Sequence, residues 1–249
     1  MTMRNEINAV DLAFVVDTTG SMGGLIQAAQ DQMITMLGEV TRAANINLWL
    51  GMVEYRDHPP QDQMVYKVYP FTADMQEAQK NIRCLKVEGG GDEPEAVLDG
   101  ITAACRLIIL VGDAPPHGTG RHGDAFPQGC PCGETIESVT RLAEEQRITV
   151  HALGLTDSVM DAFGAISHLT GGKFFSAKQG NEAIQQIAAI LKAEFADIEL
   201  DRRVLDAWRA HPDIALDNLA EQAQCTRYAA SSSMVRLLSR DLIEVPIVS

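Results

Sequence analysis

Short apolar runs and longer segments with helical spacing alternate along most of this chain. An unbroken apolar run predicts a buried strand, and apolar residues that recur every three or four positions predict a helix. Strands are predicted at residues 12–17, 47–55, 64–71, 106–112, 149–155 and 173–176. Helices are predicted at residues 25–42, 73–85 (capped by Thr72), 95–105, 135–147, 158–169 and 181–195. Repeated units of this kind predict an α/β fold, a doubly wound and mostly parallel sheet with helices on both faces.

The pattern changes after residue 200. Helical spacing predicts three short helices between residues 204 and 240, and residues 243–245 predict a short strand. This tail resembles a winged-helix or helix-turn-helix module, in which Arg227, Arg236 and Arg240 could contact phosphates. Acids roughly balance bases in the tail, which favours protein docking over DNA recognition without excluding the latter. We expect an α/β domain at residues 8–197 and a helical module at residues 200–249.

Composition narrows the function classes. With 249 residues, of which 46% are hydrophobic, the chain has an ordinary globular composition. A net charge of −14 argues against broad affinity for nucleic acid or anionic membranes. No stretch approaches the roughly 20 apolar residues of a membrane span. Five cysteines, an odd number, and the absence of an export signal predict reduced thiols in the cytoplasm.

Polar oxygen donors follow several predicted strands. Asp17, Thr19 and Ser21 alternate after the first strand, in DTTGSM, and Asp113 directly follows RLIILVG. The Gly-rich stretch GGGDEPEA adds Glu95. Ligands of open α/β sheets bind at the carboxyl ends of strands, and such oxygens suit Mg²⁺, Ca²⁺ or Mn²⁺. The alternative is that the hydroxyl residues of DTTGS only cap the following helix.

In this order the motifs resemble the metal-ion-dependent adhesion site (MIDAS) of von Willebrand factor type A (VWA) domains. DTTGS matches the first MIDAS motif, Asp-x-Ser/Thr-x-Ser, and LVGDAPPHG resembles the third. For the second motif, GGGDEPEAVLDGI resembles the Asp-x-Pro-Glu segment of integrin β-subunit VWA-like domains and of VWA domains linked to alpha-kinases. The resemblance covers residues 10–195 and implies the Rossmann-like VWA fold.

The resemblance also implies a role for each ligand. Thr19 and Ser21 would bind the cation directly, and Asp17 and Asp113 would act largely through water. Glu95 would replace the usual Thr as a direct ligand, which neutralises more of the metal's charge. Mg²⁺ is the expected cation, with Ca²⁺ or Mn²⁺ as alternatives.

Further residues surround this predicted site. Asp92 matches an acid that serves an adjacent second cation in the integrin-like group, although Gly90 stands where that group has an Asn ligand. Asp57 follows the second strand and is a candidate supporting or adjacent-cation residue. Arg56, His58 and His117 are candidate contacts for a protein partner at the rim of the predicted metal site. Alternatively, the residues before Pro59-Pro60 only form a turn.

A second metal hypothesis concerns PPHGTGRHGDAFPQGCPCG, which holds His117, His122, Cys130 and Cys132. Cysteine and histidine are zinc ligands, but C-P-C has one intervening residue and not the usual two to four. The favoured interpretation is therefore a loop shaped by Gly and Pro, with cysteines that pack as small apolar residues or are reversibly oxidised.

One junction departs from a regular α/β fold. The predicted helix that ends near Cys105 runs directly into the strand that begins at Arg106. A helix-to-strand connection usually takes about 2–6 residues. Either this helix is unusually short, or a flexible segment is missing from the chain between Cys105 and Arg106; we expect the second.

These features together predict a cytoplasmic cation-binding scaffold or adaptor. Its protein partner would supply an acidic residue to the metal. No P-loop and no G-x-S-x-G motif is present, so an enzyme is not predicted. The alternatives are a metal-dependent hydrolase using the same cleft and a DNA-binding regulator acting through the tail.

Overall fold

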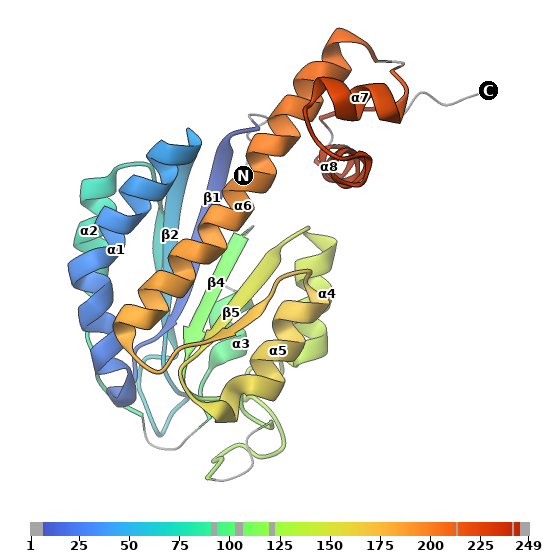
Figure 1. Ribbon diagram of the computed structural model, residues 1–249. Coiled ribbons are helices and arrows are strands. Elements are labelled where there is room, and N and C mark those ends of the chain that lie inside the picture. The colour runs from blue at the N-terminus through green and yellow to red at the C-terminus, as the bar shows by residue number, and fades with distance from the viewer. Residues whose placement is uncertain are drawn as a thin grey trace. The chain divides into compact units, whose positions relative to one another are not determined.

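A computed structural model describes residues 7–90, 94–102, 107–119, 123–212, 214–240 and 242–244 (Figure 1). The chain divides into two compact units. The larger unit comprises residues 10–39 and 48–190, and the smaller comprises residues 1–9, 40–47 and 191–249.

A six-stranded sheet with the order β3-β2-β1-β4-β5-β6 forms the centre of the larger unit. Its strands are β1 (Ala9–Asp17), β2 (Asn47–Tyr55), β3 (Tyr66–Thr72), β4 (Leu107–Gly112), β5 (Thr149–Gly154) and β6 (Phe174–Ser176). β1, β4, β5 and β6 pair in parallel, and β3 runs antiparallel to β2. The sheet is therefore mostly parallel, which confirms the predicted fold class.

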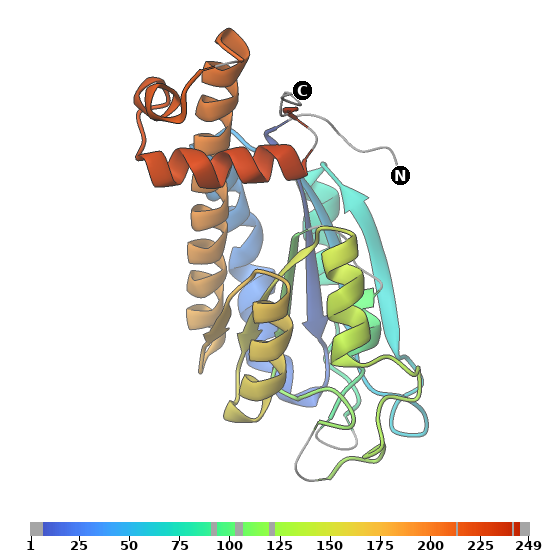
Figure 2. The ribbon, with the colours of Figure 1, turned by 90° about the vertical axis from the view of Figure 1, so that its right-hand side faces the viewer.

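Helices cover both faces of this sheet (Figures 1 and 2). They are α1 (Gly23–Ala44), α2 (Met75–Arg83), α3 (Val97–Thr102), α4 (Ile136–Glu145), α5 (Met160–Leu169) and the beginning of α6 (Gly180–Ala210). Ala13 and Val15 of β1 share a core with residues of α3, α4 and α5. Successive side chains of a strand point to opposite faces, so Phe14 and Val16 serve the other layer.

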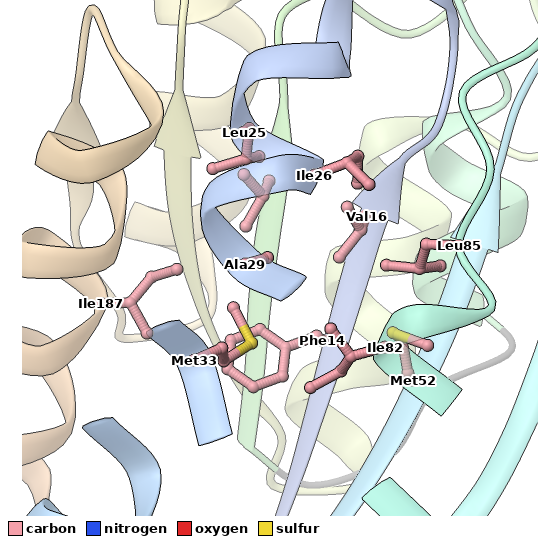
Figure 3. A pocket seen from close by; sticks show the side chains of 11 residues that line it. Phe14, Val16, Leu25, Ile26, Ala29, Met33, Met52, Ile82, Leu85 and Ile187 are labelled. Carbon is pink, nitrogen blue, oxygen red and sulfur yellow. The ribbon is translucent and has the colours of Figure 1, made fainter. Parts of the chain in front are cut away.

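That second layer is also apolar. Figure 3 shows Phe14 and Val16 of β1 facing the side chains of α1, together with Ile82 of α2 and Ile187 of α6. Both faces of β1 are thus buried, which explains why its residues 12–16 form a continuous apolar run and not an alternating one. Burial on this scale contributes about 1.5–3 kcal/mol for each large apolar side chain.

The start of α2 differs from the prediction. Asp74 caps the helix, since its carboxylate accepts a hydrogen bond from the backbone N–H of Gln76 at 2.8 Å. Thr72 instead ends β3, accepts from the N–H of Asp74 at 3.1 Å and donates to Glu77 at 2.7 Å. The prediction that Thr72 is the cap is wrong, because the strand continues far enough to include Thr72 and an acid two residues later takes the cap position.

The junction predicted to lack a segment is not tested. Helix α3 ends at Thr102 and β4 begins at Leu107. Residues 103–106, which contain Cys105 and Arg106, lie outside the described residues.

The smaller unit is helical. The second part of α6 contributes to it, together with α7 (Leu216–Gln222) and α8 (Arg227–Ser239). The buried apolar side chains at its centre are Val204, Leu205, Leu219, Ala223, Leu237 and Ile243. A separate helix predicted around Val204 is the continuation of α6, since no Gly or Pro interrupts residues 195–204. The expected boundary between residues 197 and 200 therefore lies inside a helix.

The three arginines predicted to contact phosphates have partners within the chain. Arg236 makes a two-pronged ion pair with Asp201, with N–O distances of 2.6 and 2.9 Å. Arg240 donates to the carbonyl of Ile7 at 3.3 Å, and Arg227 lies 3.4 Å from a carboxylate oxygen of Asp217. Arg236 and Arg240 are therefore less available to phosphates, whereas the Arg227 side chain remains largely exposed.

The predicted wing does not appear at its first two positions. Ile243 and Glu244 are not in a strand, and Val245 lies outside the described residues. The described part of the tail from residue 214 contains helices and turns. Across the described ranges, no helix has both the length and the apolar character needed to cross a membrane.

Candidate metal site

The direction of winding reverses at β1. This strand lies between β2 and β4, and the chain visits β2 and β3 on one side before it crosses to β4 on the other. Asp17 is the last residue of β1, and Asp113 follows the last residue of β4. The structure therefore puts both acids at the point where open α/β sheets bind ligands.

The loop after β1 orders its oxygens around Asp17. The backbone N–H and the hydroxyl of Thr19 both donate to Asp17 Oδ1, at 2.8 and 2.7 Å. Ser21 Oγ lies 3.5 Å from Thr19 Oγ1. Thr19 is buried whereas Ser21 is exposed, so this loop connects a buried carboxylate to the surface.

Capping does not explain Thr19. It precedes the short 3-10 helix η1 (Gly20–Met22), but its side chain makes no capping hydrogen bond. Its hydroxyl points back to Asp17 instead. The capping interpretation of Thr19 is therefore wrong.

The second loop brings Glu95 to the first. Its backbone N–H donates to the carbonyl of Pro115 at 3.0 Å, and its side chain is buried. A Cβ placed on Gly90 would lie 3.2 Å from Thr19 Cβ and 3.7 Å from Glu95 Oε1. Gly90 also has a φ of +87°, a conformation that favours glycine. The glycine therefore allows Thr19 and Glu95 to approach each other.

The third loop is held by hydroxyls that the sequence did not single out. Thr156 donates to the backbone carbonyl of Asp113, and Ser158 donates to the same carbonyl at 3.3 Å. Both follow β5, which is the next strand of the sheet after β4. The signal that could have identified them is their position at a third carboxyl end.

Electrostatics link the three acids. Burial, helped by the nearby Asp113 and opposed by hydrogen bonds from Thr19, raises the pKa of Asp17 to about 7. Burial likewise raises the pKa of Tyr55 well above its usual range, and Asp17, Glu95 and Asp113 add to this effect. The three carboxylates therefore lie close together in a small region that is largely shielded from water.

Two oxygens at this place suit a cation. Asp17 Oδ2 and Asp113 Oδ1 are buried and have no hydrogen-bond partner among the described residues. A buried carboxylate oxygen without a donor costs free energy unless a cation or water compensates it. Because the candidate metal ligands here are carboxylate and hydroxyl oxygens, the residues present fit Mg²⁺, Ca²⁺ or Mn²⁺.

The candidate rim residues lie inside the loops. Arg56 is buried and donates to Thr18 Oγ1 at 3.2 Å, and His58 and His117 are buried as well. Asp57 accepts from the backbone N–H of His58 at 2.5 Å and contacts His117 Nε2 at 2.8 Å. The structure thus places these residues where they brace the loops and not at an exposed rim. Asp92 lies outside the described residues.

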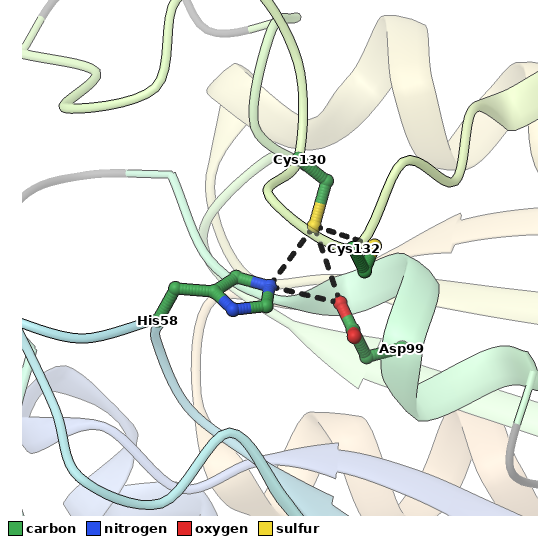
Figure 4. Close-up of side chains that lie close together, drawn as sticks. All are labelled: His58, Asp99, Cys130 and Cys132. Atoms are coloured by element: carbon green, nitrogen blue, oxygen red, sulfur yellow. Dashed lines mark hydrogen bonds and ion pairs between the residues drawn. The ribbon is translucent and has the colours of Figure 1, made fainter.

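A second group of candidate ligands lies between three segments (Figure 4). It consists of His58, Asp99, Cys130 and Cys132, whose candidate ligand atoms all lie within 4.8 Å of one another. Burial raises the pKa of both thiols above the usual range.

The sequence hypothesis for zinc had only the two cysteines of this group. His117 is instead held between Asp57 and Asp124, and His122 lies outside the described residues. His58 and Asp99 take the remaining places. His58 and Asp99 are far from Cys130 along the chain, so no short sequence motif could have grouped them with the cysteines.

Comparisons with known proteins agree with this architecture. Residues 11–115 match the von Willebrand factor A domain family. Over 195 residues the chain is 31% identical to R811 of Acanthamoeba polyphaga mimivirus, named as an ariadne-like RING finger protein, covering 70% of this chain and 19% of that protein. Over 142 residues it is 26% identical to the alpha-protein kinase vwkA of Dictyostelium discoideum, covering 52% and 23%. The chain thus spans about a fifth of the length of these relatives.

A solved structure shares the fold. It is proximal thread matrix protein 1 from the mussel byssus, in a form with a zinc-occupied MIDAS motif. The TM-score is 0.52 at 12% identity, over 76% of this chain and 46% of that one.

Proposed function

Because this chain contains a von Willebrand factor A domain, we propose that it binds a divalent cation at the carboxyl edge of its sheet and recognises a protein partner through that cation. The observation that carries the proposal is the convergence of Asp17, Glu95 and Asp113, which all act on Tyr55, with buried oxygens of Asp17 and Asp113 left without hydrogen-bond donors. VWA domains commonly mediate metal-dependent protein interaction, which supports the same function.

The proposed ligands are the five oxygen residues of the three loops. Thr19, Ser21 and Glu95 hold the ion directly, and Asp17 and Asp113 act largely through water. Mg²⁺ is the proposed ion, because it prefers oxygen ligands and keeps several waters. The bound ion supplies a Lewis-acidic centre, and the chain's own residues orient and neutralise it.

Access to this site comes through Ser21. Its side chain is exposed while Thr19 beside it is buried, so an outside group would approach from the Ser21 side. An acidic side chain of the partner is the proposed group. Glu95 limits this attraction, since it contributes a negative charge where a Thr would contribute none.

We propose an intracellular scaffold or adaptor role. The four described cysteines are free thiols, which suits a reducing compartment. The relatives named as a RING finger protein and a kinase are several times longer than this chain, which supports a recognition domain working beside another activity.

Two measurements test the proposal. Calorimetric titration of chelator-treated protein should detect Mg²⁺ binding that Ser21→Ala weakens and Ser231→Ala, an exposed serine of α8, leaves unchanged. Affinity capture from cell extract should then retain partners with wild type and Mg²⁺, and lose them with Ser21→Ala or chelator. The same partners in every condition would overturn the recognition role, and absence of cation binding would overturn the site itself.

A further inference from the structure

The proposed oxygen site does not use the cluster of His58, Asp99, Cys130 and Cys132. We propose that these four side chains bind a structural zinc ion. This inference does not depend on the proposed function, because the two ligand sets share no residue.

The chemistry of the donors favours zinc. Cys130 and Cys132 supply sulfur, His58 a ring nitrogen and Asp99 a carboxylate oxygen. Zinc accepts all three kinds of ligand, and four of them complete its preferred tetrahedron. Mg²⁺ and Ca²⁺ bind oxygen ligands and would not select thiols.

The distances suit a tetrahedral ion. With Zn–S bonds of about 2.3 Å and Zn–N bonds of about 2.0 Å, neighbouring ligand atoms lie roughly 3–4 Å apart. Here Cys130 Sγ lies 3.0 Å from His58 Nε2, 3.2 Å from Asp99 Oδ2 and 2.8 Å from Cys132 Sγ. His58 Nε2 lies 3.2 Å from Asp99 Oδ2. Shifts of about 1 Å or less would therefore enclose the ion.

The histidine is held in place by its neighbours. Its backbone N–H donates to Asp57, whose same oxygen contacts His117. The His58 ring centre lies 5.8 Å from that of His117 and 6.1 Å from that of Phe126. The backbone hydrogen bond and the two ring contacts limit the movement of the His58 side chain.

A structural role follows from the number and origin of the ligands. Four protein ligands leave no open position for a substrate. His58 follows β2, Asp99 lies in α3, and the two cysteines belong to the loop between β4 and α4. An ion held by all four would crosslink three segments that are far apart in sequence.

The crosslinked segments also carry the oxygen site. Glu95 shortly precedes α3, and Asp113 begins the loop that later contains Cys130. Zinc would therefore fix the ends of two of the three loops that supply oxygen ligands. On binding, each thiol releases its proton to solvent and coordinates as a thiolate, with no change of oxidation state.

Metal analysis of the full chain tests the proposal. Protein reconstituted with Zn²⁺ and dialysed against Mg²⁺-containing buffer should retain stoichiometric zinc by mass spectrometry. Cobalt-substituted wild type should show thiolate-to-metal charge-transfer absorption in the near ultraviolet, which an all-oxygen site cannot produce. This second readout needs no variant and so does not depend on a mutant that folds.

Matched variants locate the ion. Cys132→Ser should lower zinc affinity more than about 100-fold, beyond the 10–100-fold typical for loss of a supporting contact. Cys84→Ser, which removes an exposed thiol elsewhere, should leave zinc affinity unchanged. Asp113→Asn should also leave it unchanged, and this control separates the cluster from the oxygen site.

Several outcomes would overturn the proposal. Wild type that takes up no zinc, or a cobalt form without the charge-transfer band, would show that the cluster is only hydrogen-bonded. A Cys130–Cys132 disulfide in protein purified without oxidant would assign the pair a redox role. Zinc that survives Cys132→Ser but is lost in Asp113→Asn would place the ion in the oxygen site.

Discussion

Two ligand clusters in the larger unit differ in chemistry and in how they are satisfied. Around Asp17 the donors are all oxygens, and buried oxygens of Asp17 and Asp113 have no hydrogen-bond partner among the described residues. Around Cys130 the donors are sulfur, nitrogen and oxygen, and they contact one another at 2.8–3.2 Å. The buried oxygens of the first cluster therefore require a cation or water to compensate them, whereas the polar atoms of the second cluster already contact one another.

This difference separates two uses of a metal. Ser21 is exposed, so a cation bound in the oxygen cluster would be open to exchange with solvent and to contact with a partner. His58 and Cys130 are buried, Asp99 is half-buried and Cys132 is exposed, so an ion there would lie partly beneath the surface and be held by four protein ligands. We expect an exchangeable cation for recognition in the first cluster and a retained ion for stability in the second.

Removal of zinc should destabilise the protein more than removal of the cation from the oxygen cluster. Loss of a structural metal belongs to the mechanisms that cost about 4 kcal/mol or more. For a chain of this length, 1 kcal/mol shifts the melting temperature by roughly 2–4 °C, so a decrease of about 10 °C is expected. Differential scanning calorimetry with and without a zinc-selective chelator measures it. The Cys130→Ser, Cys132→Ser double variant should show no response to the chelator, and a full response there would contradict the zinc site.

The oxygen cluster should give the metal-free protein an unusual pH dependence. Folded Asp17 keeps its proton up to a pH of about 7, whereas the unfolded chain loses it near pH 4. The folded state therefore binds more protons between these values, and stability falls as pH rises through the window. The raised pKa corresponds to at most about 4 kcal/mol.

Urea unfolding at pH 5 and pH 8 in the presence of chelator measures this fall. Asp17→Asn cannot ionise at this position, so it should remove the part of the fall that Asp17 causes. Asp31→Asn changes an exposed carboxylate on α1 and should keep the fall. An Asp17→Asn variant with the wild-type pH profile would show that Asp17 is not the titrating group.

Mg²⁺ should stabilise the protein through Asp113 but not through the cysteine cluster. At a concentration 100 times the dissociation constant, a ligand specific for the folded state adds about 2.7 kcal/mol. Asp113→Asn should reduce this gain strongly, because it removes a charged ligand from the third loop. Thermal shift with increasing Mg²⁺ measures the effect, and Cys132→Ser serves as the control. Equal Mg²⁺ stabilisation in both variants would remove the distinction between the two clusters.

The two clusters also differ in how far sequence could predict them. Asp17, Thr19 and Ser21 are close neighbours, and the apolar run before them fixes their place at the end of β1. Gly-rich turns and strand ends similarly marked Glu95 and Asp113. His58, Asp99 and Cys130 are joined only by tertiary folding, so no local pattern could group them. The length of helix α6 was underestimated for a related reason. Its continuation beyond residue 195 is indicated only by the absence of Gly or Pro, which is a weak signal.

A substitution of Glu95 should have the smallest effect. It tests how strongly the oxygen cluster attracts a partner. Glu95→Thr removes one negative charge beside Thr19 and keeps a donor oxygen. Loss of one charged ligand should weaken Mg²⁺ binding about tenfold, or about 1.4 kcal/mol, close to the lower limit of the roughly 1.5–3 kcal/mol given by contacts to charged groups. The remaining ion is less neutralised, so its attraction to an outside carboxylate should increase.

Calorimetric titration with Mg²⁺, followed by titration of a captured partner at saturating Mg²⁺, separates these opposite changes. Glu95→Gln is the matched control for side-chain size, since it removes the charge and keeps the length. If both variants weaken Mg²⁺ and partner binding together, Glu95 serves only to hold the ion. If Mg²⁺ binding weakens while partner binding strengthens, its charge sets how strongly the bound cation attracts another protein.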